Sequence, residues 1–248
     1  MEMLRVFLGF DPRETVAFHV AAHSIHSRCS RPVAIAPLML SQLAGIFNRP
    51  RDPKQSTDFS FTRFLVPHLC GYEGWALFAD CDILVREDLA RLWDLRDDRH
   101  AVMVVKHDHV PKETTKFLGH VQTAYPKKNW SSLMLFNNAR CRGLTREYVE
   151  TAHGLELHQF KWLASDDLIG ELPAGWNCLV DTDSGGELES APNLHYTLGG
   201  PWFAATRTCG GAHDWWQELQ RTLAPVSDQG WPRLPVPAPN PLKLRVSA

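Results

Sequence analysis

Two aspartates separated by one residue carry the strongest chemical signal in this chain of 248 residues. Asp80 and Asp82 come directly after the apolar segment Trp75–Ala79. An ionised carboxylate at the end of a buried segment needs an ion partner or a metal, because burying it alone is costly. The spacing lets both carboxylates approach one hard divalent cation, which takes oxygen ligands and can bridge to a diphosphate. The pattern therefore predicts a Mn²⁺ or Mg²⁺ site. The alternative is a polar turn that Asp82 caps.

The segments around these aspartates alternate between strand-like and helix-like patterns. We expect strands at residues 4–10, 33–38, 75–79, 101–105 and 131–136, and helices near residues 61–69, 87–95, 144–152, 155–164 and 212–223. A further helix should start after Asp11-Pro12, with Asp11 as the N-cap and Glu14 completing a capping box. Alternation in the first hundred residues indicates a parallel-rich sheet covered on both faces. Ligands bind outside the carboxyl ends of such strands, where Asp11 and Asp80 both lie.

Composition excludes several classes of protein. Lys and Arg total 26 against 28 for Asp and Glu, so the net charge of −2 argues against a nucleic-acid partner. The six cysteines form no CxxC pair, which argues against a zinc ribbon or a redox motif. We find no signal peptide and no apolar run long enough to cross a bilayer, so we expect a cytoplasmic protein with reduced thiols. A peripheral contact at the inner face of the membrane, through the Pro-rich C-terminal residues, stays open, and the sequence does not indicate an oligomeric state.

The segment Asp80–Val85 after its apolar strand resembles the metal motif of nucleotide-sugar glycosyltransferases with the GT-A fold. Other segments in the same order are similar to glycosyltransferase family 8, namely Val6–Asp11, Thr62–Phe64, Asp166–Asn177 and Leu194–Trp202. This resemblance implies one α/β GT-A-type (Rossmann-like) domain over residues 1–225, with a mixed, mostly parallel central sheet flanked by helices. Its nucleotide-binding half would span about 1–106 and its acceptor and catalytic half about 107–225, followed by a Pro-rich tail at 226–248.

The resemblance also implies roles for individual residues. His195 would be the third protein ligand of the metal, and the ordinary alternative is a histidine packed against Trp202. Three residues would contact the nucleotide-sugar beside Asp80, namely Phe10, Asp11 and Arg63. For Arg63, whose planar guanidinium suits a phosphate or a base, the alternative is a surface ion pair.

The chain departs from the family pattern in two places. The glycine pair Gly199-Gly200 stands where the family usually has a lysine that contacts phosphate. Backbone amides of a glycine turn could cradle the anion instead. The family's glutamine position falls on Asp166. If Asp166 and Asp167 enter the cleft, one of them would hold donor-sugar hydroxyls or face the anomeric carbon, and the alternative is a helix cap or a turn.

These features favour a glycosyltransferase that moves a sugar from a nucleotide-sugar, with UDP as the nucleotide the resemblance implies, to a hydroxyl of a carbohydrate or glycolipid acceptor. The family comparison implies retention of configuration. Two other enzymes fit parts of the pattern: a haloacid-dehalogenase-like phosphatase with Asp80 as the nucleophile, and a nucleotidyltransferase of related fold. The donor sugar, the acceptor and the linkage are not indicated by any residue pattern.

Overall fold

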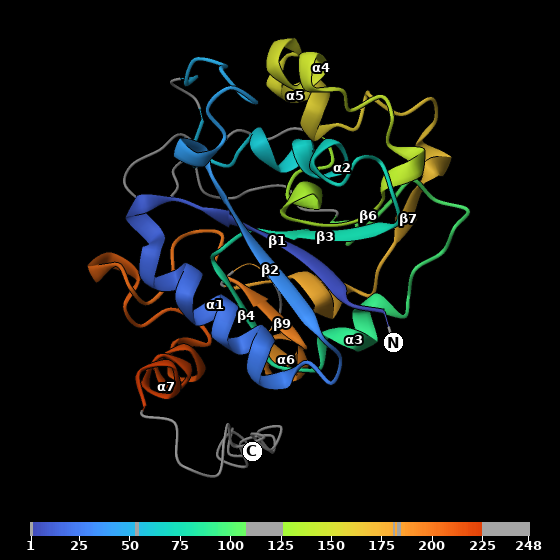
Figure 1. Ribbon diagram of the computed structural model, residues 1–248. Coiled ribbons are helices and arrows are strands. Elements are labelled where there is room, and N and C mark those ends of the chain that lie inside the picture. The colour runs from blue at the N-terminus through green and yellow to red at the C-terminus, as the bar shows by residue number, and fades with distance from the viewer. Residues whose placement is uncertain (1, 53–54, 108–125, 181, 183–184, 225–248) are drawn as a thin grey trace.

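A six-stranded sheet runs through the middle of the computed structural model, which describes residues 2–52, 55–107, 126–180, 182 and 185–224 (Figure 1). The strands lie in the order β2 (Val33–Met39), β1 (Leu4–Phe10), β3 (Trp75–Ala79), β6 (Leu133–Asn137), β5 (Val102–Val104) and β7 (Ile169–Glu171). β1 pairs in parallel with β2 and β3, and β5 pairs in parallel with β7. β6 runs antiparallel to its neighbours β3 and β5. The predicted mixed, mostly parallel sheet is therefore confirmed.

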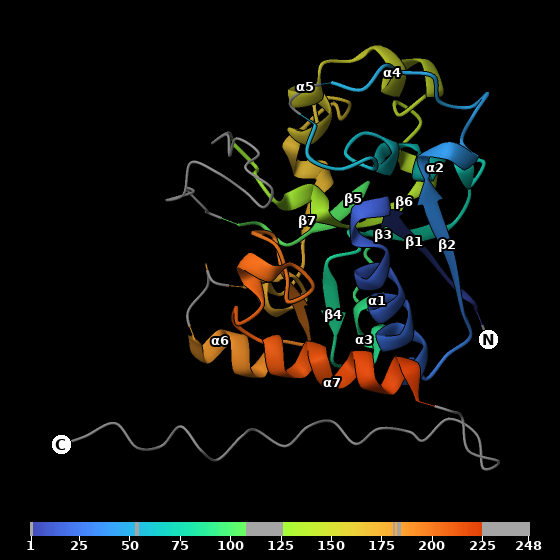
Figure 2. The same ribbon diagram turned by 90° about the vertical axis from the view of Figure 1, so that its left-hand side faces the viewer.

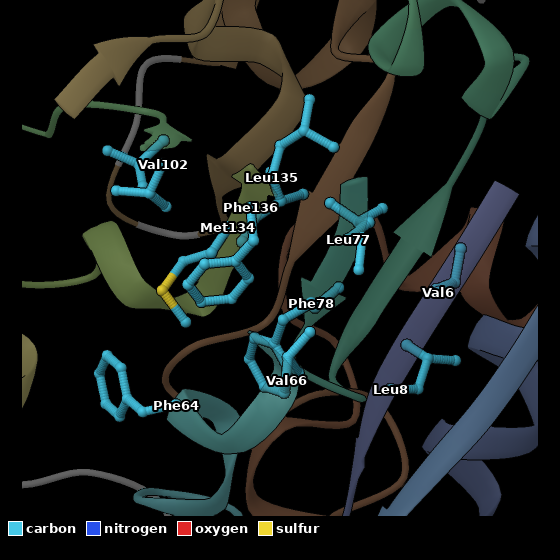
Figure 3. Close-up of a cluster of buried hydrophobic side chains, with 14 of the residues drawn as sticks. Val6, Leu8, Phe64, Val66, Leu77, Phe78, Val102, Met134, Leu135 and Phe136 are labelled. Carbon is cyan, nitrogen blue, oxygen red and sulfur yellow. The ribbon is translucent and has the colours of Figure 1, made fainter. Parts of the chain in front are cut away.

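The central strands are apolar because both faces of the sheet are covered. Every residue of β3 and β6 is buried, as expected for strands with packed elements above and below. Figure 3 shows part of the core that results, in which Phe64 and Val66 lie near Phe78, Met134 and Phe136. These five side chains are fully buried. This packing holds the strand ends, and the polar residues that follow them, in fixed places.

The helices cover the two faces of the large sheet. They are α1 (Thr15–Arg28), α2 (Val66–Leu69), α3 (Leu89–Trp93), α4 (Arg146–Thr151), α5 (Gly154–His158), α6 (Gly185–Ser190) and α7 (Ala212–Leu223). Figures 1 and 2 show α2, α4 and α5 on one side of the sheet, and α1, α6 and α7 on the other. Short 3-10 helices join several of these elements, including Pro12–Glu14, Thr62–Leu65, Trp130–Ser132, Asp166–Leu168 and Ala174–Asn177. No helix in the described part of the chain is long and apolar enough to span a bilayer.

A second sheet of three short strands lies on the α1 side. Its order is β4 (Ile83–Val85), β9 (Asn193–His195) and β8 (Cys178–Leu179). β4 pairs antiparallel with β9, so that Ile83 stands opposite His195. The sequence patterns did not predict these strands, because runs of two or three residues are too short to show a period. The small sheet places His195 opposite Ile83, the residue that follows the predicted ligand Asp82.

Most predicted elements are confirmed with small changes at their ends. The strand at 131–136 begins later, at Leu133, because Trp130–Ser132 forms a 3-10 helix. The helix expected at 155–164 ends at His158, and Phe160 then has a positive φ of 60°. The predicted capping box after Asp11 is wrong. Asp11 accepts a hydrogen bond from the Arg13 amide, but the Glu14 carboxyl is buried and forms no hydrogen bond. The Pro-rich tail expected at 226–248 lies outside the described residues.

All six cysteines are free thiols. Cys81, Cys141 and Cys178 are buried, whereas the other three are half-buried. Burial raises the pKa of the Cys141 thiol well above its usual value.

Candidate metal and donor site

The three residues predicted to hold a metal come together at the carboxyl edge of β3. Asp80 and Asp82 lie in the link between β3 and β4, and His195 ends β9. The Nε2 atom of His195 is 3.3 Å from Asp82 Oδ1 and 3.9 Å from Asp80 Oδ2. One ligand atom from each residue lies within 4.8 Å of the other two.

This arrangement fits a divalent cation. Two carboxylate oxygens and one imidazole nitrogen form a donor set that Mn²⁺ and Mg²⁺ accept, with further positions left for phosphate oxygens. Ligands of an ion about 2.1 Å away stand roughly 3 Å apart at neighbouring positions of an octahedron. The observed contacts of 3.3 and 3.9 Å are near that spacing. His195 is 2% exposed, so its ring is confined to this place by the surrounding protein.

Arg63 is anchored beside the same carboxylates. It is buried, and its Nη1 lies 2.9 Å from Asp80 Oδ1 and donates to the Ser131 carbonyl at 2.8 Å. The rings of Phe59 and Phe78 lie 5.3 and 5.0 Å from the guanidinium carbon, close enough for cation–π attraction. The alternative of a surface ion pair is therefore wrong. Arg63 restrains Asp80, and a contact with a nucleotide-sugar stays a prediction.

Asp11 holds the turn after β1 together. Its carboxylate accepts from the amide, Nε and Nη2 of Arg13 at 2.9, 2.8 and 2.6 Å, and from the Asp58 amide at 3.1 Å. Burial opposes its ionisation, but the hydrogen bonds from Arg13 and Asp58 and the charge of Arg13 together outweigh burial and lower the pKa of Asp11. The neighbouring Phe10 packs edge-on against Phe18. The turn predicted to contact the nucleotide-sugar is therefore held together by the hydrogen bonds that Asp11 accepts.

Glu14, which the sequence pattern assigned to a capping box, is a fully buried carboxyl. It is 0% exposed, and neither of its oxygens has a hydrogen-bond partner. Burial, followed by the negative charges of Asp82, Asp11 and Asp80, raises its pKa well above the usual value. An acidic residue three positions after an N-cap has the pattern of a capping box. Only the packing shows that Glu14 turns toward the aspartates.

Asp166 and Asp167 do not belong to the cluster formed by the three candidate ligands. Both are exposed in the 3-10 helix that precedes β7. The Oδ1 atom of Asp166 lies 2.6 Å from Lys127 Nζ, and the hydrogen bond from this lysine lowers the pKa of Asp166. Asp167 accepts from the Ser165 hydroxyl at 3.0 Å. Their predicted contact with the donor sugar stays a prediction.

Packing and backbone conformation explain the glycine pair Gly199-Gly200. A Cβ atom at Gly200 would lie 2.0 Å from the ring of Trp202, and Gly199 has a φ of 105°, which favours glycine. Trp202 packs against Tyr196 and Trp215, with ring centroids 5.8 and 5.2 Å apart. A side chain at position 200 would therefore displace the Trp202 ring. The Gly199 amide donates to the Tyr196 carbonyl at 2.8 Å, so an anion contact stays a prediction for the Gly200 amide alone.

The two ends of β6 differ in their relation to the site. Ser132 lies at the candidate site, because its carbonyl accepts from the Asp80 amide at 2.9 Å. Asn138 lies at the opposite edge and donates to the Glu73 carbonyl at 3.0 Å. The antiparallel direction of β6 therefore removes Asn138 from the residues that could contact a sugar. The sequence pattern His107-Asp108-His109 could also bind a metal, but Asp108 and His109 lie outside the described residues.

The sequence matches a known family and a plant protein. The family model Glycosyl transferase family 8 matches residues 22–184, a range that includes Arg63, Asp80 and Asp82 but not His195. Protein CDI of Arabidopsis thaliana is 47% identical over 223 residues, which cover 87% of this chain and 86% of the plant protein.

Solved structures of glycosyltransferases share the fold. The galactosyltransferase LgtC, in complex with donor and acceptor sugar analogues, aligns with a TM-score of 0.54 and 13% identity, over 93% of this chain and 100% of LgtC. Apo GlyE of Streptococcus pneumoniae TIGR4 aligns with a TM-score of 0.59 and 16% identity, over 90% of this chain. The bifunctional WbbM aligns with a TM-score of 0.56 and 14% identity, over 88% of this chain. The chain spans 61% of the GlyE chain and 49% of the WbbM chain.

Proposed function

Because the chain belongs to glycosyl transferase family 8 and is a glycosyltransferase, we propose that it transfers the sugar of a nucleotide-sugar to an acceptor hydroxyl with the help of a divalent cation. The observation that carries this proposal is the grouping of Asp80, Asp82 and His195 at the carboxyl edge of the sheet. We propose UDP as the nucleotide and a carbohydrate or glycolipid as the acceptor. The LgtC structure, which holds donor and acceptor sugar analogues on a similar fold, supports a site for both substrates.

The chain's own residues would prepare the site for the donor. Arg63 holds Asp80 in place through an ion pair, and the hydrogen bond from Arg63 to the Ser131 carbonyl fixes the guanidinium itself. Burial keeps the His195 ring pointed at both aspartates. Mn²⁺ or Mg²⁺, when bound, would stabilise the charge on the departing nucleoside diphosphate. Such preorganised groups lower the barrier because they need no rearrangement when the charge develops.

The remaining roles are part of the same proposal. Phe10 and Asp11 form the turn against which the base would lie. The amide of Gly200 would face phosphate oxygens, because the Gly199 amide already donates to the Tyr196 carbonyl at 2.8 Å. Asp166 or Asp167 would orient the donor sugar for transfer with retention of configuration. The cytoplasmic location and the peripheral membrane contact expected from the sequence stay predictions.

The phosphatase alternative requires Asp80 to attack a phosphoryl group. The ion pair with Arg63 and the shared site with Asp82 and His195 fit a metal ligand instead. The family match over residues 22–184 supports the glycosyltransferase and does not favour either alternative.

A thermal-shift panel tests the proposal. Each nucleoside diphosphate is added with Mn²⁺ or with EDTA, because a ligand that binds the native state raises the melting temperature. At about one hundred times Kd the stabilisation is about 2.7 kcal/mol. We expect a shift with UDP that needs Mn²⁺, that is lost in Asp82→Asn, and that is kept in Asp94→Asn, which changes a surface partner of Arg31. If no nucleotide gave a metal-dependent shift, or if Asp82→Asn behaved like the wild type, the proposal would be wrong.

A further inference from the structure

A buried amide lies behind the imidazole of His195. Asn177 ends the 3-10 helix Ala174–Asn177 and is 0% exposed. Its Oδ1 lies 2.9 Å from His195 Nδ1, on the side of the ring opposite to the aspartates. Its Nδ2 lies 2.9 Å from Ser132 Oγ, 3.0 Å from His107 Nε2 and 3.3 Å from the Asn129 carbonyl. The amide therefore has partners for both its oxygen and its nitrogen.

These partners determine which way the amide faces. A backbone carbonyl only accepts hydrogen bonds, so the group that faces Asn129 must be the NH₂ of Asn177. The oxygen then faces His195 and can only accept, which requires a hydrogen on His195 Nδ1. The Nε2 atom of His195 is the ring nitrogen that remains toward Asp80 and Asp82. A histidine binds a metal through its unprotonated nitrogen, and the bond made by the other nitrogen selects which one that is.

The surroundings hold Asn177 in this orientation. The Ser132 hydroxyl donates to the Asn129 carbonyl at 2.6 Å, so two of the three groups that face Nδ2 are bonded to each other. Asn129 itself has a φ of 65°, a left-handed conformation uncommon for a residue other than glycine. Asn193 on β9 donates to the Trp176 carbonyl at 2.8 Å and ties the 3-10 helix to the strand that carries His195. Ser132 also accepts from the Asp80 amide through its carbonyl, so one residue supports two of the candidate ligands.

We propose that Asn177 is a positioning residue that holds the imidazole of His195 with Nε2 toward Asp80 and Asp82 and thereby sets the affinity of the site for its divalent cation. The inference rests on the metal site of the proposed function. Partners of this kind behind a ligating histidine typically account for a factor of 10 to 100 in metal affinity. A neutral amide suits position 177 because its NH₂ donates to the Asn129 carbonyl. A carboxylate at this position has no hydrogen to donate, so two oxygens would face each other and this hydrogen bond would be lost.

Mn²⁺ binding to the protein without nucleotide tests this role, with free Mn²⁺ measured by electron paramagnetic resonance. Asn177→Leu keeps a similar side-chain volume and removes the amide. The matched control is Asn138→Leu, which removes another buried amide that bonds to a carbonyl at the opposite end of β6. We expect the Mn²⁺ affinity to fall about 10- to 100-fold in Asn177→Leu and to stay near that of the wild type in Asn138→Leu. Asn177→Ala serves for the same readouts if the leucine variant does not fold.

A second measurement distinguishes the loss of His195 positioning from a general destabilisation of the fold. ¹⁵N NMR of the metal-free protein reports whether the His195 Nδ1 atom carries a hydrogen. We expect this hydrogen in the wild type and in Asn138→Leu, and its loss from Nδ1 in Asn177→Leu. An Asn177→Leu protein that folds with unchanged Mn²⁺ affinity and an unchanged Nδ1 signal would overturn the inference, as would an equal loss in Asn138→Leu. A wild type that binds no Mn²⁺ would instead contradict the proposed function, and the Nδ1 signal would still decide whether Asn177 fixes the ring.

Discussion

The substitution Glu218→Gln tests how α7 is fixed to the rest of the fold. Glu218 lies in α7 and is 1% exposed. Its carboxylate lies 2.6 Å from His23 Nδ1 and 2.6 Å from Arg28 Nη2, both on α1, and Arg221 lies 3.4 Å away. Helix α1 starts near the turn after β1 and packs against β4, which follows Asp82. The network therefore joins α7 to the helix that contacts both of these elements.

The expected loss follows from the pKa of Glu218. Burial opposes its ionisation, but the hydrogen bonds from His23 and Arg28 and the charge of Arg28 outweigh burial and lower the pKa from 4.5 to about 2. A group with a depressed pKa in the folded state stabilises the fold above its ordinary pKa, and this stabilisation disappears as the pH falls through the folded value. At about 1.4 kcal/mol per unit, the ionised carboxylate contributes about 3 kcal/mol at pH 7. At pH 3 the contribution falls to about 1 kcal/mol.

Urea unfolding at pH 7 and pH 3, followed by tryptophan fluorescence, measures this contribution. We expect Glu218→Gln to lower the free energy of unfolding by about 3 kcal/mol at pH 7 and the difference from the wild type to shrink at pH 3. The matched control is Glu87→Gln, which removes the same charge from an exposed pair with Arg91. Exposed pairs contribute less than about 1 kcal/mol. The reasoning would be refuted if Glu218→Gln lowered the free energy of unfolding by no more than Glu87→Gln does. It would also be refuted if the decrease in Glu218→Gln were the same at pH 7 and pH 3.

Three further predictions concern the neighbourhood of the site. Gly200→Ala should lower the free energy of unfolding by about 1–3 kcal/mol, because the added Cβ meets the Trp202 ring; an unchanged melting temperature would contradict this. Glu14 has a raised pKa because of its burial and the nearby aspartates, so its neutral form stabilises the metal-free fold below the ordinary pKa and this is lost as the pH rises. Raising the pH from 4 to 8 should therefore lower the melting temperature of the wild type more than that of Glu14→Gln, which stays neutral. A difference between the two melting temperatures that does not change with pH would contradict the raised pKa of Glu14. In native protein, iodoacetamide should label half-buried Cys209 before buried Cys81 and Cys141, as peptide mass spectrometry would show; early labelling of Cys141 would contradict its burial.

The sequence by itself determined the features that depend on near neighbours. β1, β3 and α7 have the predicted bounds, because each has a long apolar or amphipathic pattern that is read within one element. Asp80 and Asp82 were identifiable because two carboxylates directly after a buried strand are costly without a partner. The order of the family-like segments was enough to predict the GT-A type of fold.

Tertiary structure decided everything that depends on residues far apart in the chain. β4, β8 and β9 are too short to form alone and exist because each is paired with a neighbour, so the place of His195 beside Asp82 is a result of packing. The same holds for Glu14, whose local pattern is that of a helix cap, but whose carboxyl is buried near Asp82. Asn177 has a function in the site only because its amide meets His195, Ser132 and Asn129 across three separate segments. A local pattern reports which side of an element is apolar, but burial and hydrogen bonding between elements are set by the long-range packing of the whole chain.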